Sequence, residues 1–127
     1  MLKTNELRIG NLVIYASKIV EIEGINKNTI YHSKGQFDQN IEPAYEPFRQ
    51  IQLTEDWLLK FGFIKDQPEG WFYKQPIDIL NQRFLLFKHK DLPYYYADGC
   101  FSPYLKYVHQ LQNLYYSLTG EELRLSH

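Results

Sequence analysis

The sequence has little of what several common functions require. It contains one cysteine, so it cannot form an internal disulfide, and an oxidising compartment is not indicated. Its formal net charge is −1, which argues against a globally basic protein that holds nucleic acid by counterion release. The apolar runs, for example those at 12–16 and 57–59, are too short to cross a bilayer, and no signal-peptide pattern is expected at the start of the sequence. We therefore expect a cytoplasmic protein without membrane contact.

Motifs for common catalytic chemistries are also missing. No phosphate-binding glycine loop, zinc-type spacing of Cys and His, or Gly-flanked nucleophilic serine occurs. The four histidines are widely separated along the chain, which predicts neither a metal site nor a cofactor; they are His32, His89, His109 and His127.

Cys100 is the one residue that invites a catalytic interpretation. It lies two residues before Ser102, the expected N-cap of a helix whose dipole would favour a thiolate, and His109 would then be its base. A lone cysteine is more often a small buried hydrophobic residue, and His109 falls more than two turns into the expected helix. We expect no enzyme activity and no small-molecule substrate.

Aromatic residues are abundant. They make up 17% of the 127 residues, including 11 Tyr and 8 Phe, while the hydrophobic fraction of 44% and the charged fraction of 23% are those of an ordinary globular chain. A chain of this length buries enough surface for one core without disulfides or metal. The open question is whether the surplus rings belong to that core or to a binding surface.

The first third of the chain has the period of β-strands. Residues 12–15 are rich in β-formers, 18–25 alternate between apolar and charged side chains, and 29–32 follow a tight turn at 26–28. Short strands so close together predict a small curled or barrel-like sheet. Gly35, Pro43 and Pro47 interrupt the pattern, so 33–53 is expected to be a loop that ends in a strand near 49–53.

Two helices are bounded by clear signals. The first is short, with Thr54 as its N-cap and Gly62 just beyond its end. The second is longer and is expected to run from Ser102, followed by Pro103 at the first helical position, to Thr119–Gly120.

Between the helices lie four β-like segments, at 63–65, 71–74, 82–90 and 94–97. Residues 83–87 are apolar on both sides, which is typical of a central strand covered on each face, and 121–125 is compatible with one more short strand. The sequence thus predicts a single α+β domain over 1–127. Its β-rich part at 1–53 is followed at 54–127 by an antiparallel meander packed with one short and one long helix.

Three stretches stand out along the chain: NELRIGN at 5–11, LTEDWLLKFGF at 53–63 and YVHQLQNLYYSLTGEEL at 107–123. In this order they resemble a family of small proteins from phages and mobile elements of Bacteroidota. The resemblance implies a bacterial cytoplasm and an accessory role, directed for example against a host defence system. It supplies no catalytic residue.

Two groups of residues are candidates for contact with a protein partner. On the long helix, a second stripe lies beside the main apolar side; Tyr and His with an apolar anchor are typical of binding patches, although the same stripe would serve equally well as interior. In the triple tyrosine, a strand places the middle ring opposite the other two, so at least one phenol is expected to reach solvent. These candidates are Leu105, His109, Gln112 and Tyr116 on the helix, and Tyr94, Tyr95 and Tyr96 on the strand.

Basic residues interleaved with rings at 71–90 support an alternative, a surface for single-stranded RNA or DNA. Its candidates are Trp71, Lys74, Arg83, Lys88, His89 and Lys90. The competing interpretation is that the rings form core and the charges form a polar rim. From the sequence we expect a non-catalytic phage or mobile-element protein that inhibits or remodels a host protein or ribonucleoprotein complex, in the manner of an anti-CRISPR inhibitor. A small nucleic-acid-binding module is the alternative.

Overall fold

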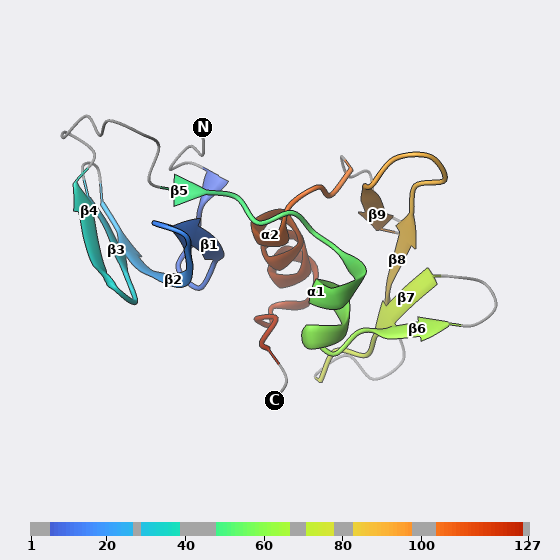
Figure 1. Cartoon of the computed structure of the whole chain (residues 1–127). Coiled ribbons are helices and arrows are strands. Elements are labelled where there is room, and N and C mark those ends of the chain that lie inside the picture. Colours follow the sequence, from blue (N-terminus) through green and yellow to red (C-terminus); the bar gives the residue numbers. More distant parts are fainter. Residues whose placement is uncertain are drawn as a thin grey trace. The chain divides into compact units, whose positions relative to one another are not determined.

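A computed structural model describes residues 6–26, 29–38, 48–66, 71–77, 83–97 and 104–125. The chain forms two compact units, Met1–Ile51 and Gln52–His127, and each is described by itself (Figure 1). Among the described residues, the first unit contains strands and no α-helix, whereas the second contains strands and two helices, so the predicted α+β class is confirmed.

The N-terminal unit is an antiparallel sheet of five strands in the order β4-β3-β2-β1-β5. Its strands are β1 (Leu12–Tyr15), β2 (Lys18–Ile25), β3 (Thr29–His32), β4 (Gly35–Asp38) and β5 (Phe48–Arg49). The first three have the limits that the alternation predicts. The turn before β3 is closed by Asn26, whose side-chain Oδ1 accepts a hydrogen bond from the Thr29 N–H at 2.8 Å.

Within the described segments the sheet of this unit is open: of the two predicted forms, a curled sheet or a barrel-like one, no closed barrel is found. Among the described residues, β4 and β5 are the two edges and pair only with β3 and β1. Strand β4 lies within the segment expected to be a loop, because Gly35, taken as a breaker, begins the strand with φ of 136°. The core beneath the sheet consists of Val13, Val20, Ile22, Ile30 and Phe48.

His32 is buried beside this core. Its ring lies 4.5 Å from that of Tyr15 and 5.6 Å from that of Phe48, and its Nδ1 accepts the Lys34 N–H. Burial lowers the pKa of His32, partly opposed by the charge of Glu23. A neutral His32 is therefore part of the packed structure, and its role here is structural.

The C-terminal unit is built on a four-stranded antiparallel meander in the order β6-β7-β8-β9. The strands are β6 (Ile64–Asp66), β7 (Trp71–Lys74), β8 (Phe84–Lys88) and β9 (Tyr95–Ala97), and the helices are α1 (Glu55–Lys60) and α2 (Val108–Thr119). Both helices lie on the same side of the sheet (Figure 1). Tyr115 of α2 packs against the sheet: its ring centroid lies 5.0 Å from that of Phe84 in β8 and 6.4 Å from that of Phe63, just before β6.

Helix α1 follows its sequence signals. The Thr54 hydroxyl accepts the Trp57 N–H at 3.4 Å, and Gly62, with φ of 88°, follows the last turn. Glu55 and Asp56 stand in the first turn and Lys60 in the last, each matching the sign of the helix dipole.

Helix α2 starts later than predicted, and this is a correction. Ser102 and Pro103 lie outside the described residues, but Leu105 exchanges two backbone hydrogen bonds with Tyr95, at 2.6 and 3.0 Å. The segment at Leu105 is thus extended and paired with β9, where the sequence predicted the first turns of the helix. The helix begins instead at Val108, where Gln110 Oε1 accepts the N–H groups of Lys106 and Tyr107. Residues 121–125, whose sequence is compatible with a short strand, do not form a strand.

Candidate functional site: an aromatic face of the β6–β9 sheet

The alternation of strands sorts the side chains of the β6–β9 sheet onto an inner face and an outer face. The inner face, on the side of the helices, carries the buried side chains of the sheet, which are Phe72, Phe84, Leu86, Tyr95 and Ala97. The outer face lacks a helix among the described residues, and its side chains are half-buried or exposed. The prediction that 83–87 is covered on both faces is therefore wrong for the outer one, where Leu85 and Phe87 are only half-buried.

Rings in mutual contact cover this outer face. We call it the aromatic face and define it by Trp71, Tyr73, Phe87, Tyr94, Tyr96 and Tyr104. Successive ring centroids are 5.9 Å apart for Tyr73–Trp71, 6.0 Å for Trp71–Phe87, 5.5 Å for Phe87–Tyr96 and 6.2 Å for Tyr96–Tyr104. The two middle pairs are stacked, with interplanar angles of 27° and 20°. The rings thus form one row across three strands and the segment before α2.

A cation caps the row near each end. The Arg83 guanidinium lies 4.8 Å from the Tyr73 centroid, and the Lys106 ammonium lies 4.7 Å from that of Tyr94, which itself stacks on Tyr104 at 6.1 Å. Such contacts hold the tyrosine rings in place. The two cations also cover parts of the Tyr73 and Tyr94 rings that would otherwise be accessible. Trp71 and Tyr96, which stack on Phe87, cover its ring in the same way.

The candidates for nucleic-acid binding divide between the two faces. Trp71 belongs to the aromatic face, with Arg83 capping it and His89 touching the Tyr104 ring at 5.2 Å. Lys74 and Lys88, in contrast, are paired in register with the inner-face residues Phe84 and Tyr95 and share their side of the sheet. The predicted basic stripe is therefore not one surface.

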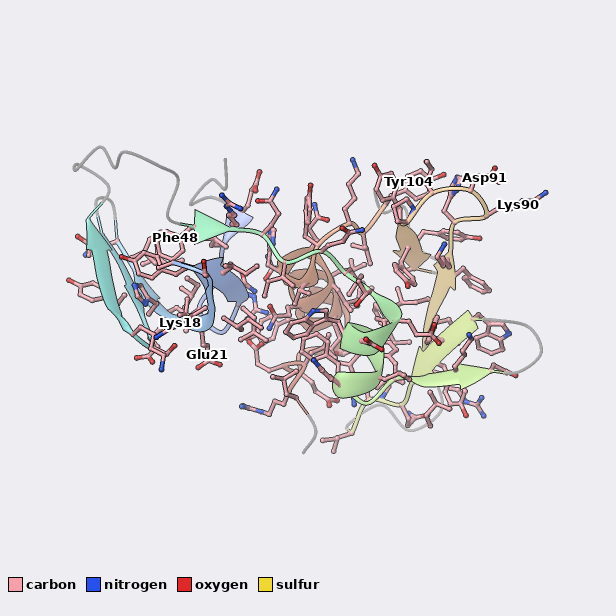
Figure 2. The ribbon with its side chains drawn as sticks, viewed as in Figure 1. Lys18, Glu21, Phe48, Lys90, Asp91 and Tyr104 are labelled. Atoms are coloured by element: carbon pink, nitrogen blue, oxygen red, sulfur yellow. The ribbon has the colours of Figure 1, made fainter. Side chains whose placement is uncertain are left out.

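The remaining members of that set lie at the β8–β9 turn. The His89 Nδ1 accepts the N–H groups of Asp91 and Leu92, both at 3.1 Å, so the imidazole shapes the turn. Lys90 is exposed and adjoins Asp91, an opposite charge. Figure 2 shows Tyr104 at the same end of the sheet as Lys90 and Asp91.

The stripe predicted on the long helix is not an exposed patch, and of the two interpretations that the sequence left open, the interior one holds for most of it. Leu105 precedes the helix and is 3% exposed because it pairs with Tyr95. His109 and Gln112 are on α2, but both are buried beside Val108 and Leu111. Tyr116 alone of the four is exposed. Leu105, His109 and Gln112 are therefore interior residues, which is one of the two roles that the sequence left open.

The triple tyrosine divides as the alternation requires. Tyr95 is 2% exposed on the inner face, whereas Tyr96 is 39% exposed and Tyr94 is half-buried on the aromatic face. The sequence-based candidates missed Tyr73, Phe87, Tyr104 and Lys106. Tyr73 and Phe87 could have been identified from the sequence, because side chains alternate between the two faces along β7 and β8. The others depend on the bridge that brings the segment before α2 beside β9.

Cys100, the residue with a catalytic interpretation, lies outside the described part of the chain. The described residues contain no cluster of three or more His, Cys, Asp or Glu side chains of the kind that holds a metal ion. None of the helices in those same segments is long and apolar enough to span a bilayer. Comparison with known proteins finds no matching family model, no matching curated protein and no matching solved structure.

Proposed function

We propose that this chain is a non-catalytic binding protein that attaches to a protein partner through the aromatic face. The observation that carries the proposal is the continuous row of rings on a sheet face that no helix covers among the described residues. Tyr, Trp and Arg are the residue types that most often dominate the energy of protein interfaces, and all three occur in this row or at its end. Rings already fixed by their neighbours lose little conformational freedom on binding, which favours affinity.

The arrangement of the rings favours a protein over single-stranded nucleic acid. Base stacking requires open ring faces. Here Phe87 is stacked between Trp71 and Tyr96, and the Tyr73 ring is covered by Arg83. Phosphate contacts require several cations on the same surface, but Lys74 and Lys88 belong to the other face.

Charge defines the chemistry of the proposed partner. Arg83 and Lys106 stand near opposite ends of the row, with apolar ring surface between them. A matching surface has an apolar centre with acidic side chains at its edges. The resemblance of the three sequence stretches to phage and mobile-element proteins supports a host protein or ribonucleoprotein complex as partner. The chain would inhibit or remodel it, as an anti-CRISPR inhibitor does.

The test compares exposed tyrosines on and off the aromatic face. The double variant Tyr96→Thr/Tyr104→Thr removes two exposed rings and keeps residues suited to extended backbone. The control is Tyr31→Thr in β3, a ring that is 43% exposed, compared with 39% for Tyr96 and 46% for Tyr104. Tagged proteins are used to capture partners from a bacterial lysate, with and without nuclease. The recovered protein is then purified and its affinity for each variant is measured.

We expect the purified partner to bind the wild type and the Tyr31 control equally and to lose at least about tenfold in affinity for the double variant. Tyr116→Thr is expected to bind as the wild type does. Capture that disappears with nuclease, or salt-sensitive binding of a fluorescent single-stranded oligonucleotide, would favour the nucleic-acid alternative. A loss of affinity in Tyr116→Thr but not in the double variant would move the interface to α2.

A further inference from the structure

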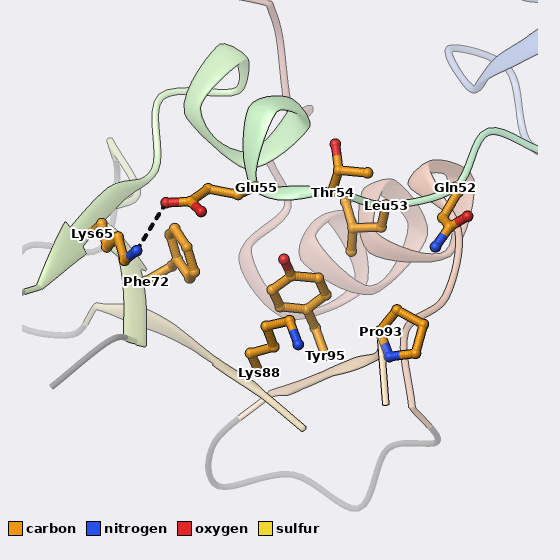
Figure 3. A pocket seen from close by; sticks show the side chains of 9 residues that line it. All are labelled: Gln52, Leu53, Thr54, Glu55, Lys65, Phe72, Lys88, Pro93 and Tyr95. Atoms are coloured by element: carbon orange, nitrogen blue, oxygen red, sulfur yellow. Dashed lines mark ion pairs between the residues drawn. The ribbon is translucent and has the colours of Figure 1, made fainter. Parts of the chain in front are cut away.

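A cavity opens on the inner side of the β6–β9 sheet, the side that carries Phe72 and Tyr95. Its volume is about 320 Å³, at the lower end of the range for small-ligand sites. Each of the four strands contributes one lining residue, and the segment leading into α1 supplies the opposite wall. The strand residues are Lys65, Phe72, Lys88 and Tyr95 (Figure 3).

The cavity has an apolar floor. The Phe72 and Tyr95 rings meet edge to face, with centroids 6.1 Å apart, and Leu53 and Pro93 add apolar surface. A flat apolar group of a ligand would find van der Waals contacts there on several sides.

Two ammonium groups flank this floor, and they differ in how they are paired. Lys65 forms an ion pair of 3.1 Å with Glu55. Lys88, within the described segments, has no ion pair, and its ammonium makes only a long hydrogen bond of 3.4 Å to the Leu92 carbonyl. With two lysines and one glutamate, the lining carries a formal charge of +1.

The Tyr95 hydroxyl is a second polar group of the cavity lining. The residue is 2% exposed, and its phenol forms no hydrogen bond to any residue that the structure describes. The hydroxyl points to the side of the cavity where Thr54 and Glu55 lie (Figure 3). Burial, with the nearby Glu55 charge, raises the pKa of Tyr95, so the phenol keeps its proton and can donate it in a hydrogen bond. The hydroxyl belongs to a residue that lines the cavity, so it is placed to donate a hydrogen bond to a bound ligand.

We infer that this cavity binds a small organic anion that has a flat apolar body and one acidic group. The body rests on Phe72 and Tyr95, and the acid accepts hydrogen bonds from the Lys88 ammonium and the Tyr95 hydroxyl. A carboxylate and a phosphate monoester share this chemistry. The site is separate from the aromatic face, because the two lie on opposite sides of the same sheet. From the sequence we expect no small-molecule substrate, and the inferred site adds a small-molecule ligand.

The experiment titrates the ¹⁵N-labelled full chain with three probes of similar shape: phenylacetate, phenyl phosphate and uncharged phenylacetamide. We expect either anion to shift the backbone amide signals of Lys88 and Tyr95, and phenylacetamide to bind at least about tenfold more weakly. The tighter of the two anions identifies the acid. Equal binding of the amide, or no shift with either anion, would overturn the inference.

Two variants, Lys88→Gln and Tyr95→Phe, test which residues contact the anion, and Lys90→Gln is their control. Lys88→Gln, at an exposed position on β8, is expected to weaken anion binding about tenfold. Lys90→Gln removes the same charge from the neighbouring turn and is expected to leave binding unchanged. Tyr95→Phe removes only the hydroxyl and is expected to weaken binding several-fold. If Lys88→Gln and Lys90→Gln behave alike, the anion responds to overall charge and the cavity is not its site.

Discussion

The two faces of the β6–β9 sheet are both rich in aromatic residues, yet they differ in what covers them. On the inner face, Phe72, Phe84 and Tyr95 are at most 7% exposed, because the helices and the segments beside them complete the core. On the outer face, Trp71, Phe87 and Tyr96 are shielded mainly by one another. Residue type alone therefore does not separate core from binding surface. The difference predicts that inner substitutions lower stability, whereas outer substitutions lower binding.

The strongest test of this difference uses adjacent leucines on β8. Leu86 is 0% exposed on the inner face, whereas Leu85 is half-buried on the outer face. Leu86→Ala leaves a cavity in the core and is expected to lower the free energy of unfolding by about 2–5 kcal/mol. Leu85→Ala removes less buried surface and is expected to cost about 1 kcal/mol.

Urea denaturation followed by tryptophan fluorescence measures both effects. The chain has two tryptophans, Trp57 and Trp71, and both belong to the C-terminal unit, so the signal reports this unit. Equal losses for the two leucines would show that the outer face is covered as fully as the inner one.

A second, smaller effect concerns the phenol of Tyr115, which packs on the inner face. Burial, followed by the charge of Glu121, raises the pKa of Tyr115 to about 12 from 10. Because the folded state holds this proton more tightly than the unfolded state, the contribution to stability is complete below pH 10 and is lost as the pH rises towards 12. The loss corresponds to about 2–3 kcal/mol.

Urea denaturation of the wild type at pH values from 9 to about 11.5 measures this loss. Tyr115→Phe is expected to flatten the fall in stability above pH 10. Tyr104→Phe, which makes the same change on the aromatic face, leaves Tyr115 in place and is the matched control. An alkaline profile unchanged by Tyr115→Phe would mean that this phenol is not the buried group that titrates.

The smallest effect is expected at the ends of the aromatic row. Arg83→Gln removes the cation over Tyr73 and is expected to lower the free energy of unfolding by about 0.5–1 kcal/mol. Lys90→Gln removes a similar charge from the β8–β9 turn, where no ring contact involves Lys90 among the described residues. Urea denaturation that gives the same midpoint for both variants would contradict a role for Arg83 in fixing the ring.

The fold was predictable where short-range signals set it. The alternation of Lys18–Ile25 and the turn at Asn26 locate β2 and β3, and Thr54 locates the start of α1, because each depends on residues close by in the sequence. Prediction was wrong where a distant partner intervened. The segment at 104–107 carries helix-forming spacing, but Leu105 gains two backbone hydrogen bonds from Tyr95 and stays extended.

The candidate site was predictable only in part, for a related reason. The period of two assigns Tyr94 and Tyr96 to one side of a strand and Tyr95 to the other, whatever the rest of the chain does. It does not say which side the helices cover. Lys74, Lys88 and Arg83 therefore read as one basic stripe in the sequence, although the pairing with Phe84 and Tyr95 divides them between two faces.

The sequence by itself determined the α+β class, the limits of β1, β2, β3 and β7, and the caps of the short helix, since these follow from local alternation and from hydrogen bonds between near neighbours. Only the tertiary structure decided which rings remain accessible, where α2 begins, and that Lys88 and Tyr95 meet at one cavity. The reason is physical: exposure depends on what packs above a residue, and the groups that cover or join these side chains come from distant parts of the chain.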